Sequence, residues 1–135
     1  MRNIYIDSSA ILKLIVQEKE SDAVRSISRA RFITSEISRV EIIRTVLRNE
    51  PKALKAAQGV LKNLNILTID SATLTQAERL PERTNIRGLD AIHLAAAGKL
   101  GLRISVILTY DKQMAKAARE LGFEVMAPTE VEVEG

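Results

Sequence analysis

Residues 3–16 read NIYIDSSAILKLIV, a short apolar run that meets Asp7 and continues as a helix-like stretch. A strand-like run followed by an amphipathic stretch predicts a βα unit. Residues 106–115, VILTYDKQMA, repeat this construction with Asp111 in the equivalent position. Both aspartates are therefore expected at the carboxyl end of a strand, immediately before a helix.

The same alternation continues along the chain and predicts an α/β fold with three layers, α/β/α. Strands are expected near residues 3–7, 32–34, 66–69, 104–109 and 124–126. Helices are expected near residues 9–18, 21–30, 36–48, 51–63, 72–80, 89–101 and 112–121. Because no linker or low-complexity tract interrupts this pattern, we expect residues 1–135 to form one domain.

The composition excludes several kinds of site. The 135 residues include no cysteine and one histidine, which excludes disulfides, thiolate metal centres and His-rich zinc sites. The lack of cysteine favours a reducing compartment, and we expect a cytoplasmic protein. The apolar stretch up to Val16 is interrupted by Asp7 and Lys13, so neither a signal peptide nor a membrane span is predicted.

Basic residues outnumber acidic ones, and the formal net charge is +3. Many of the bases gather in the two helical stretches between residues 36 and 63: Arg39, Arg44, Arg48, Lys52, Lys55 and Lys62. They are either the solvated faces of ordinary helices or a surface that attracts phosphate, as a nuclease requires. Composition leaves both interpretations open.

Asp7 and Asp111 also have two interpretations on local sequence alone. An aspartate before a helix is most often an N-cap, and Asp70 is interpreted in this way. Alternatively, the carboxyl ends of neighbouring strands form the ligand crevice of an α/β sheet, where oxygen ligands suit Mg²⁺ or Mn²⁺. The hydroxyls of Ser9 and Thr109, two residues from these aspartates, favour the crevice.

Two further acids fall in predicted helices. Asp90 lies in GLDAIHLAAA (residues 88–97), which is apolar enough to be largely buried, and a carboxylate there is costly unless it is paired or bound to a metal. Glu41 should point towards the sheet, although Ser38 and Glu41 also match a capping box. The apolar stripe beside Glu41 consists of Ile37, Val40, Ile43 and Leu47.

His93 is the only histidine and lies one turn after Asp90. A hydrogen-bonded imidazole on a buried helix face is the simpler interpretation. A role in orienting Asp90 or contacting a substrate is the alternative, and we do not expect His93 to be a metal ligand.

Four parts of the chain form a set: YIDSSAILKL at 5–14, Glu41, GLDAIHLA at 88–95 and LTYDKQMA at 108–115. In order and spacing this set resembles PIN-domain ribonucleases, and among them the VapC-type toxins of prokaryotic toxin–antitoxin pairs. No single segment is decisive, but together they cover nearly the whole chain. The resemblance implies a five-stranded parallel sheet in the order 3-2-1-4-5.

The resemblance also assigns roles at a catalytic metal site. The acidic quartet of the family corresponds to Asp7, Glu41, Asp90 and Asp111, with Ser9 and Thr109 as neighbouring hydroxyls. Asp7, Asp90 and Asp111 are implied as ligands of Mg²⁺ or Mn²⁺, and Glu41 as the residue that orients the attacking water. Asp70 would lie on the edge strand, ~10 Å from Asp7, because neighbouring strands are about 4.8 Å apart.

The implied function is that of a metal-dependent endoribonuclease, the toxin of a type II toxin–antitoxin pair. Such toxins usually form homodimers, and a small antitoxin covers the acidic pocket. Helices 9–18 and 21–30 are candidates for the groove that binds the antitoxin.

Two alternatives belong to other classes of protein. One is a receiver-like domain with Asp70 as the phosphoacceptor and Thr109 as its hydroxyl. Against it, such domains have a pair of acids after the first strand, where this chain has Asp7 alone. The other alternative is a PIN-like binding module without nuclease activity, against which the intact quartet argues.

Overall fold

The structure is a computed structural model and describes residues 1–104 and 106–131. Ser105 of the predicted strand 104–109, and residues 132–135 of the predicted domain, lie outside this part. A parallel sheet of five strands has the order β3-β2-β1-β4-β5. The strands are β1 (Arg2–Ile6), β2 (Ala30–Ser35), β3 (Asn65–Leu67), β4 (Val106–Leu108) and β5 (Val125–Met126). The predicted fold class and strand order are confirmed.

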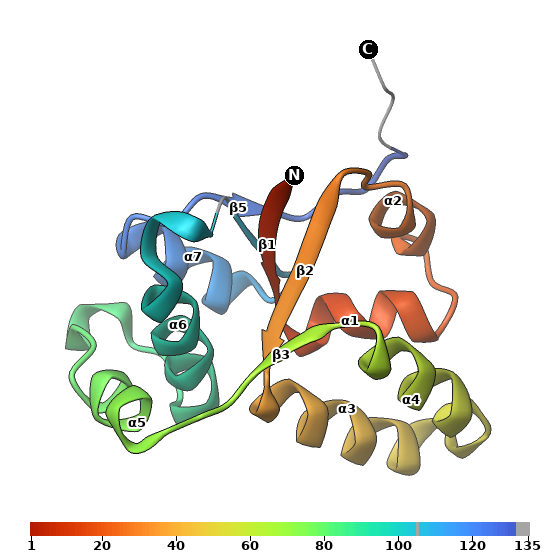
Figure 1. The fold of residues 1–135 in the computed structure, drawn as a ribbon, viewed down its shortest axis with the longest axis horizontal. Coiled ribbons are helices and arrows are strands. Elements are labelled where there is room, and N and C mark those ends of the chain that lie inside the picture. The colour runs from red at the N-terminus through yellow and green to blue at the C-terminus, as the bar shows by residue number, and fades with distance from the viewer. Residues whose placement is uncertain (105, 132–135) are drawn as a thin grey trace.

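Helices cover both faces of the sheet, as Figure 1 shows. One face carries α1 (Ser8–Ile15), α2 (Ser21–Arg25), α3 (Glu36–Asn49) and α4 (Leu54–Lys62), with a 3-10 turn, η1 (Pro51–Ala53), before α4. The other face carries α5 (Ser71–Glu78), α6 (Gly88–Leu100) and α7 (Lys112–Glu120), with the 3-10 turns η2 (Glu82–Thr84) and η3 (Gly101–Arg103) on either side of α6. Among the described residues, no helix is both long and apolar enough to cross a membrane.

The sheet divides the core into two parts. Successive side chains of a strand point to opposite faces, so Ile4 and Ile6 of β1 pack with α1, α2, α3 and α4, whereas Tyr5 packs with α6 and α7. In β4, Leu108 lies in the first part and Ile107 in the second. A parallel sheet that is covered on both faces explains why these strands are apolar without alternation.

Three helices begin with the same local structure, an aspartate that ends the strand segment and caps the helix. Asp7 accepts a hydrogen bond from the N–H of Ala10, and Asp70 accepts one from the N–H of Thr73. Asp111 caps α7 through two backbone N–H groups. Each carboxylate satisfies N–H groups that have no partner within their helix. The strand order, however, places Asp70 beyond β2, away from the other two.

Two predicted helices end clearly earlier than expected, and the helix predicted at 51–63 begins with the 3-10 turn η1 before α4. The helix predicted at 9–18 ends at Ile15, and the helix predicted at 21–30 ends at Arg25. Residue Ala30 instead begins β2, where it pairs with Arg2 of β1. The residues after Arg25 are locally compatible with a helix or a strand. Pairing with β1 favours a strand from Ala30 onward.

The predicted apolar stripe of α3 is wrong in register. The side chains that α3 buries are Ser38, Ile42 and Val46, while Val40 is 61% exposed and Leu47 44% exposed. The hydroxyl of Ser38 shares a hydrogen bond with that of Thr34 on β2, which allows a serine to take an inward position. The capping box is also wrong, because α3 begins at Glu36 and Ser38 lies inside the helix.

Ile42 should therefore carry a large part of the packing of α3. Ile42→Ala is expected to lower the free energy of unfolding by about 2–5 kcal/mol, because it leaves a cavity at a fully buried position. Val40→Ala is the matched control on the same helix and should change stability little, since Val40 is exposed. Urea unfolding measures both, and equal losses would contradict the observed register.

Candidate active site

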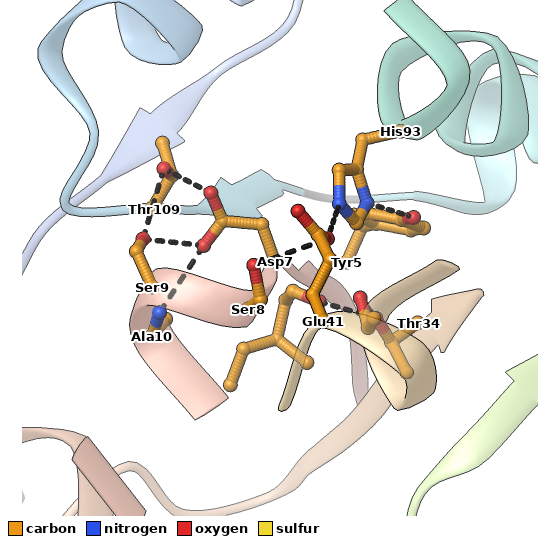
Figure 2. A network of polar contacts seen from close by, with 11 residues as sticks. Tyr5, Asp7, Ser8, Ser9, Ala10, Thr34, Glu41, His93 and Thr109 are labelled. Atoms are coloured by element: carbon orange, nitrogen blue, oxygen red, sulfur yellow. Dashed lines mark hydrogen bonds and ion pairs between the residues drawn. The ribbon is translucent and has the colours of Figure 1, made fainter. Parts of the chain in front are cut away.

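Asp7 is a buried carboxylate at the carboxyl end of β1, with an exposed fraction of 4%. Its Oδ1 accepts hydrogen bonds from Ser9 Oγ at 2.6 Å and from the N–H of Ala10 at 3.1 Å, and its Oδ2 accepts one from Thr109 Oγ1. Burial raises the pKa of Asp7, and these hydrogen bonds act in the opposite direction. Figure 2 shows Asp7 enclosed by these donors.

Asp111 lies between β4 and α7, and it is next to Asp7 in the fold because β4 pairs directly with β1. Its Oδ1 accepts hydrogen bonds from the N–H groups of Gln113 at 2.9 Å and Met114 at 3.0 Å. Thr109 joins the two aspartates, since its hydroxyl donates to Asp7 and accepts from the N–H of Asp111 at 3.1 Å. Asp111 is exposed, unlike Asp7.

Glu41 reaches the same edge of the sheet from α3. Its Oε1 accepts a hydrogen bond from Ser8 Oγ at 3.2 Å and lies 2.7 Å from His93 Nε2. Ser8 begins α1, directly after Asp7, so this contact ties Glu41 to the first turn of that helix. The prediction that Glu41 points towards the sheet is confirmed. The apolar stripe on which that prediction was based is nevertheless wrong, because α3 buries other residues.

Asp90 lies half-buried in the first turn of α6. Burial raises its pKa, and the negative charges of Asp111, Asp7 and Glu41 raise it further, while His93 lowers it. Four carboxylates from three helix starts and the middle of α3 therefore act on one another electrostatically. In the described part of the chain, the Asp90 side chain has no hydrogen-bond partner.

His93 is buried, as predicted, but its partner is Glu41 and not Asp90. The imidazole is 2% exposed and also contacts the hydroxyl of Tyr5, 2.9 Å from Nδ1. The sequence drew attention to the hydroxyl of Ser8 beside Asp7 but assigned it no contact with Glu41, and it assigned Tyr5 no role in the site. Their signal was weak, because a tyrosine inside a strand and a serine in a first turn are common for structural reasons.

In the structure Asp7, Glu41, Asp90 and Asp111 lie together at the carboxyl ends of the central strands, and Asp70 lies outside this group. Asp70 caps α5 and forms an ion pair with Lys99 at 2.8 Å, which leaves no role for it in a shared site. Within residues 1–104 and 106–131, no three acidic or histidine side chains form a ready-made metal cluster. The four carboxylates are thus close enough to affect one another electrostatically, but they do not form a coordination shell.

Comparison with known proteins places the chain in a family. The PIN domain matches residues 4–120. Ribonuclease VapC46 of Mycobacterium tuberculosis is 43% identical over 131 residues, which cover 96% of this chain and 100% of that protein.

Two solved structures have the same fold at low identity. The chain resembles Mycobacterium tuberculosis VapC20, a Sarcin-Ricin loop cleaving toxin, with a TM-score of 0.68 and 18% identity, over 89% of this chain and 95% of that one. It resembles a toxin-antitoxin complex from Klebsiella pneumoniae with a TM-score of 0.72 and 17% identity, over 92% of this chain and 96% of that one. The receiver-like alternative is therefore wrong. The chain belongs to the PIN-domain family, in which its relatives are VapC proteins.

Proposed function

We propose that this protein is a metal-dependent endoribonuclease and the toxin of a type II toxin–antitoxin pair. The observation that carries the proposal is the meeting of Asp7 and Asp111 at the carboxyl ends of the paired strands β1 and β4, where Thr109 joins them and the charges of both act on Asp90. Relatives named ribonuclease, and a structural neighbour described as cleaving the Sarcin-Ricin loop, support RNA as the substrate class.

We assign Asp7, Asp90 and Asp111 as the residues that would hold Mg²⁺ or Mn²⁺. Oxygen donors and mutually repelling negative charges suit a hard cation. When bound, such an ion supplies a more acidic water and compensates the charge that develops on the scissile phosphate.

The other polar residues would support this chemistry. Ser9 and Thr109 hold both oxygens of Asp7 in place, so they would fix the carboxylate that lies deepest in the site. Glu41 would orient the attacking water. The exposed bases of α3 and α4 would attract the RNA backbone, and their attraction should weaken as salt is added.

The antitoxin would also bind at α3 and α4. A groove between α3 and α4 is lined by apolar side chains and by the bases Arg39, Arg44 and Lys62. An amphipathic segment with acidic flanks is complementary to this surface in shape and charge. The groove predicted at helices 9–18 and 21–30 remains the alternative place, and a toxin-antitoxin complex from Klebsiella pneumoniae among the structural neighbours supports an antitoxin as the partner. A homodimer remains a prediction.

RNA cleavage tests the proposed function. The wild type is expected to cleave total bacterial RNA with Mn²⁺ or Mg²⁺ and to stop when EDTA is added, whereas Asp7→Asn should be slower by about two orders of magnitude or more, since metal-ion catalysis is worth several kcal/mol. Asp70→Asn is the matched control, because Asp70 caps a helix in the same way but lies outside the site. Equal rates for the wild type and Asp7→Asn would contradict the proposal.

The repulsion among the carboxylates should appear in the pH dependence of stability. The pKa of Asp90 is raised in the folded protein, so its contribution to stability is full below the unfolded-state pKa and is lost as the pH rises through the folded-state pKa. Asp90→Asn is therefore expected to be more stable than the wild type near neutral pH. That advantage should shrink on acidification to about pH 4, near the ordinary pKa of the group.

Asp70→Asn should behave in the opposite way. The hydrogen bond from Lys99 lowers the pKa of Asp70, so this carboxylate stabilises the fold at neutral pH and its removal should destabilise it. Urea unfolding at neutral and acidic pH measures all three proteins. A constant difference between Asp90→Asn and the wild type at every pH would show that Asp90 is not under electrostatic strain.

Metal binding can be detected without any RNA. Mn²⁺ should raise the melting temperature of the wild type, because a ligand that binds the folded state alone stabilises it by about 2.7 kcal/mol at a hundredfold excess over Kd. Thermal denaturation should show a smaller rise in melting temperature for Asp90→Asn than for the wild type. For Asp70→Asn the rise should equal that of the wild type. Equal rises for all three proteins would place the ion elsewhere.

A further inference from the structure

A buried chain of hydrogen bonds crosses from the sheet to Glu41. It runs from the hydroxyl of Tyr5 to His93 Nδ1 at 2.9 Å, and from His93 Nε2 to Glu41 Oε1 at 2.7 Å. Figure 2 shows these contacts beside Asp7 and Ser8. The three residues come from β1, α6 and α3, which meet only in the folded protein.

We propose that His93 is a positioning residue: oriented by Tyr5, it holds Glu41 through one oxygen and leaves the other oxygen for the attacking water. This inference rests on the proposed nuclease function, because the water belongs to that reaction. It assigns His93 no contact with RNA and no metal.

The burial of the chain makes it suitable for positioning. Tyr5 is 1% exposed and His93 is 2% exposed, so water does not compete for their hydrogen bonds and each bond is stronger than it would be in solvent. The two rings also meet edge to face, with centroids 5.9 Å apart and planes at 74°. The imidazole is thus fixed by packing as well as by hydrogen bonds.

The direction of the chain follows from its donors and acceptors. A carboxylate only accepts hydrogen bonds, so Nε2 must carry the hydrogen and donate it to Glu41. A neutral imidazole then has an acceptor at Nδ1, and the hydroxyl of Tyr5 donates to it.

Both contacts of Glu41 use the same oxygen. Ser8 Oγ and His93 Nε2 each meet Oε1, and Oε2 has no partner among the described residues. A carboxylate that is anchored through one oxygen retains a single direction for the other. General-base and water-orienting groups need this directional control, because the proton that they receive must lie within hydrogen-bond reach.

Kinetics of variants test the role of His93. His93→Leu should lower kcat for cleavage of total bacterial RNA by about 10–100-fold, as outer partners of catalytic carboxylates do, with KM unchanged. His93→Gln, which keeps an N–H near the position of Nε2, should recover most of this loss. Tyr5→Phe should lower kcat less than His93→Leu does, because the ring remains and only its orienting hydroxyl is lost.

Tyr110→Phe is the matched control for Tyr5→Phe. It removes a tyrosine hydroxyl that donates to the carbonyl of Pro128 at 2.6 Å, and its kcat should equal that of the wild type. Melting temperatures of all four variants separate folding from positioning. If His93→Leu and Tyr5→Phe melt at lower temperature but keep the wild-type kcat, His93 is purely structural and the inference is overturned.

Nitrogen NMR of the imidazole tests the chain without any RNA. Because His93 is the only histidine, labelling with ¹⁵N-histidine reports on this ring alone. We expect a protonated, pyrrole-type Nε2, because this is the nitrogen that donates to Glu41. An Nε2 without a hydrogen, as in the reverse tautomer, would leave Glu41 without this donor and overturn the inference. This measurement tests the hydrogen-bond chain separately from RNA cleavage, so a failure of the chain and a failure of the nuclease function are distinguishable.

Discussion

The buried carboxylate of Asp7 is the interaction on which the rest of the site depends. Burying a charge is costly unless hydrogen bonds replace the lost water, and here they come from Ser9, the N–H of Ala10 and Thr109. Because these donors belong to α1 and to the segment after β4, satisfying Asp7 fixes how β1, α1 and β4 meet. Ser8 and Asp111 follow from that arrangement, since Ser8 precedes Ser9 and the N–H of Asp111 donates to Thr109.

The three helix-capping aspartates show how one local structure serves different ends. Asp7, Asp70 and Asp111 each accept backbone N–H groups at a helix start. The order of the parallel strands brings Asp7 and Asp111 together. Asp70 follows the edge strand β3, where it forms an ion pair with Lys99. A carboxylate that caps a helix can therefore also belong to the candidate site, and the strand order decides which of the three does so.

Much of the fold could be predicted from the sequence, because the alternation of apolar runs and amphipathic stretches depends on neighbouring residues. The strands and the capped starts of α1, α5 and α7 were found in this way. The end of α2 and the buried face of α3 could not be, since the first depends on pairing between Ala30 and Arg2 and the second on contact of Ser38 with Thr34. Arg2 lies on another strand, and Thr34 lies on β2 before α3 begins, so periodicity within one helix carries no information about either contact.

The sequence by itself determined the α/β fold class and the acidic residues of the candidate site, and its resemblance to the PIN domain supplied the strand order. Only the tertiary structure decided how the acids are held. Tyr5, His93 and Glu41 are far apart along the chain and meet through side chains from three elements. Hydrogen bonds are directional and reach only about 3 Å, so their partners are set by the packing of α3 and α6 against β1. No pattern within a single element contains that information.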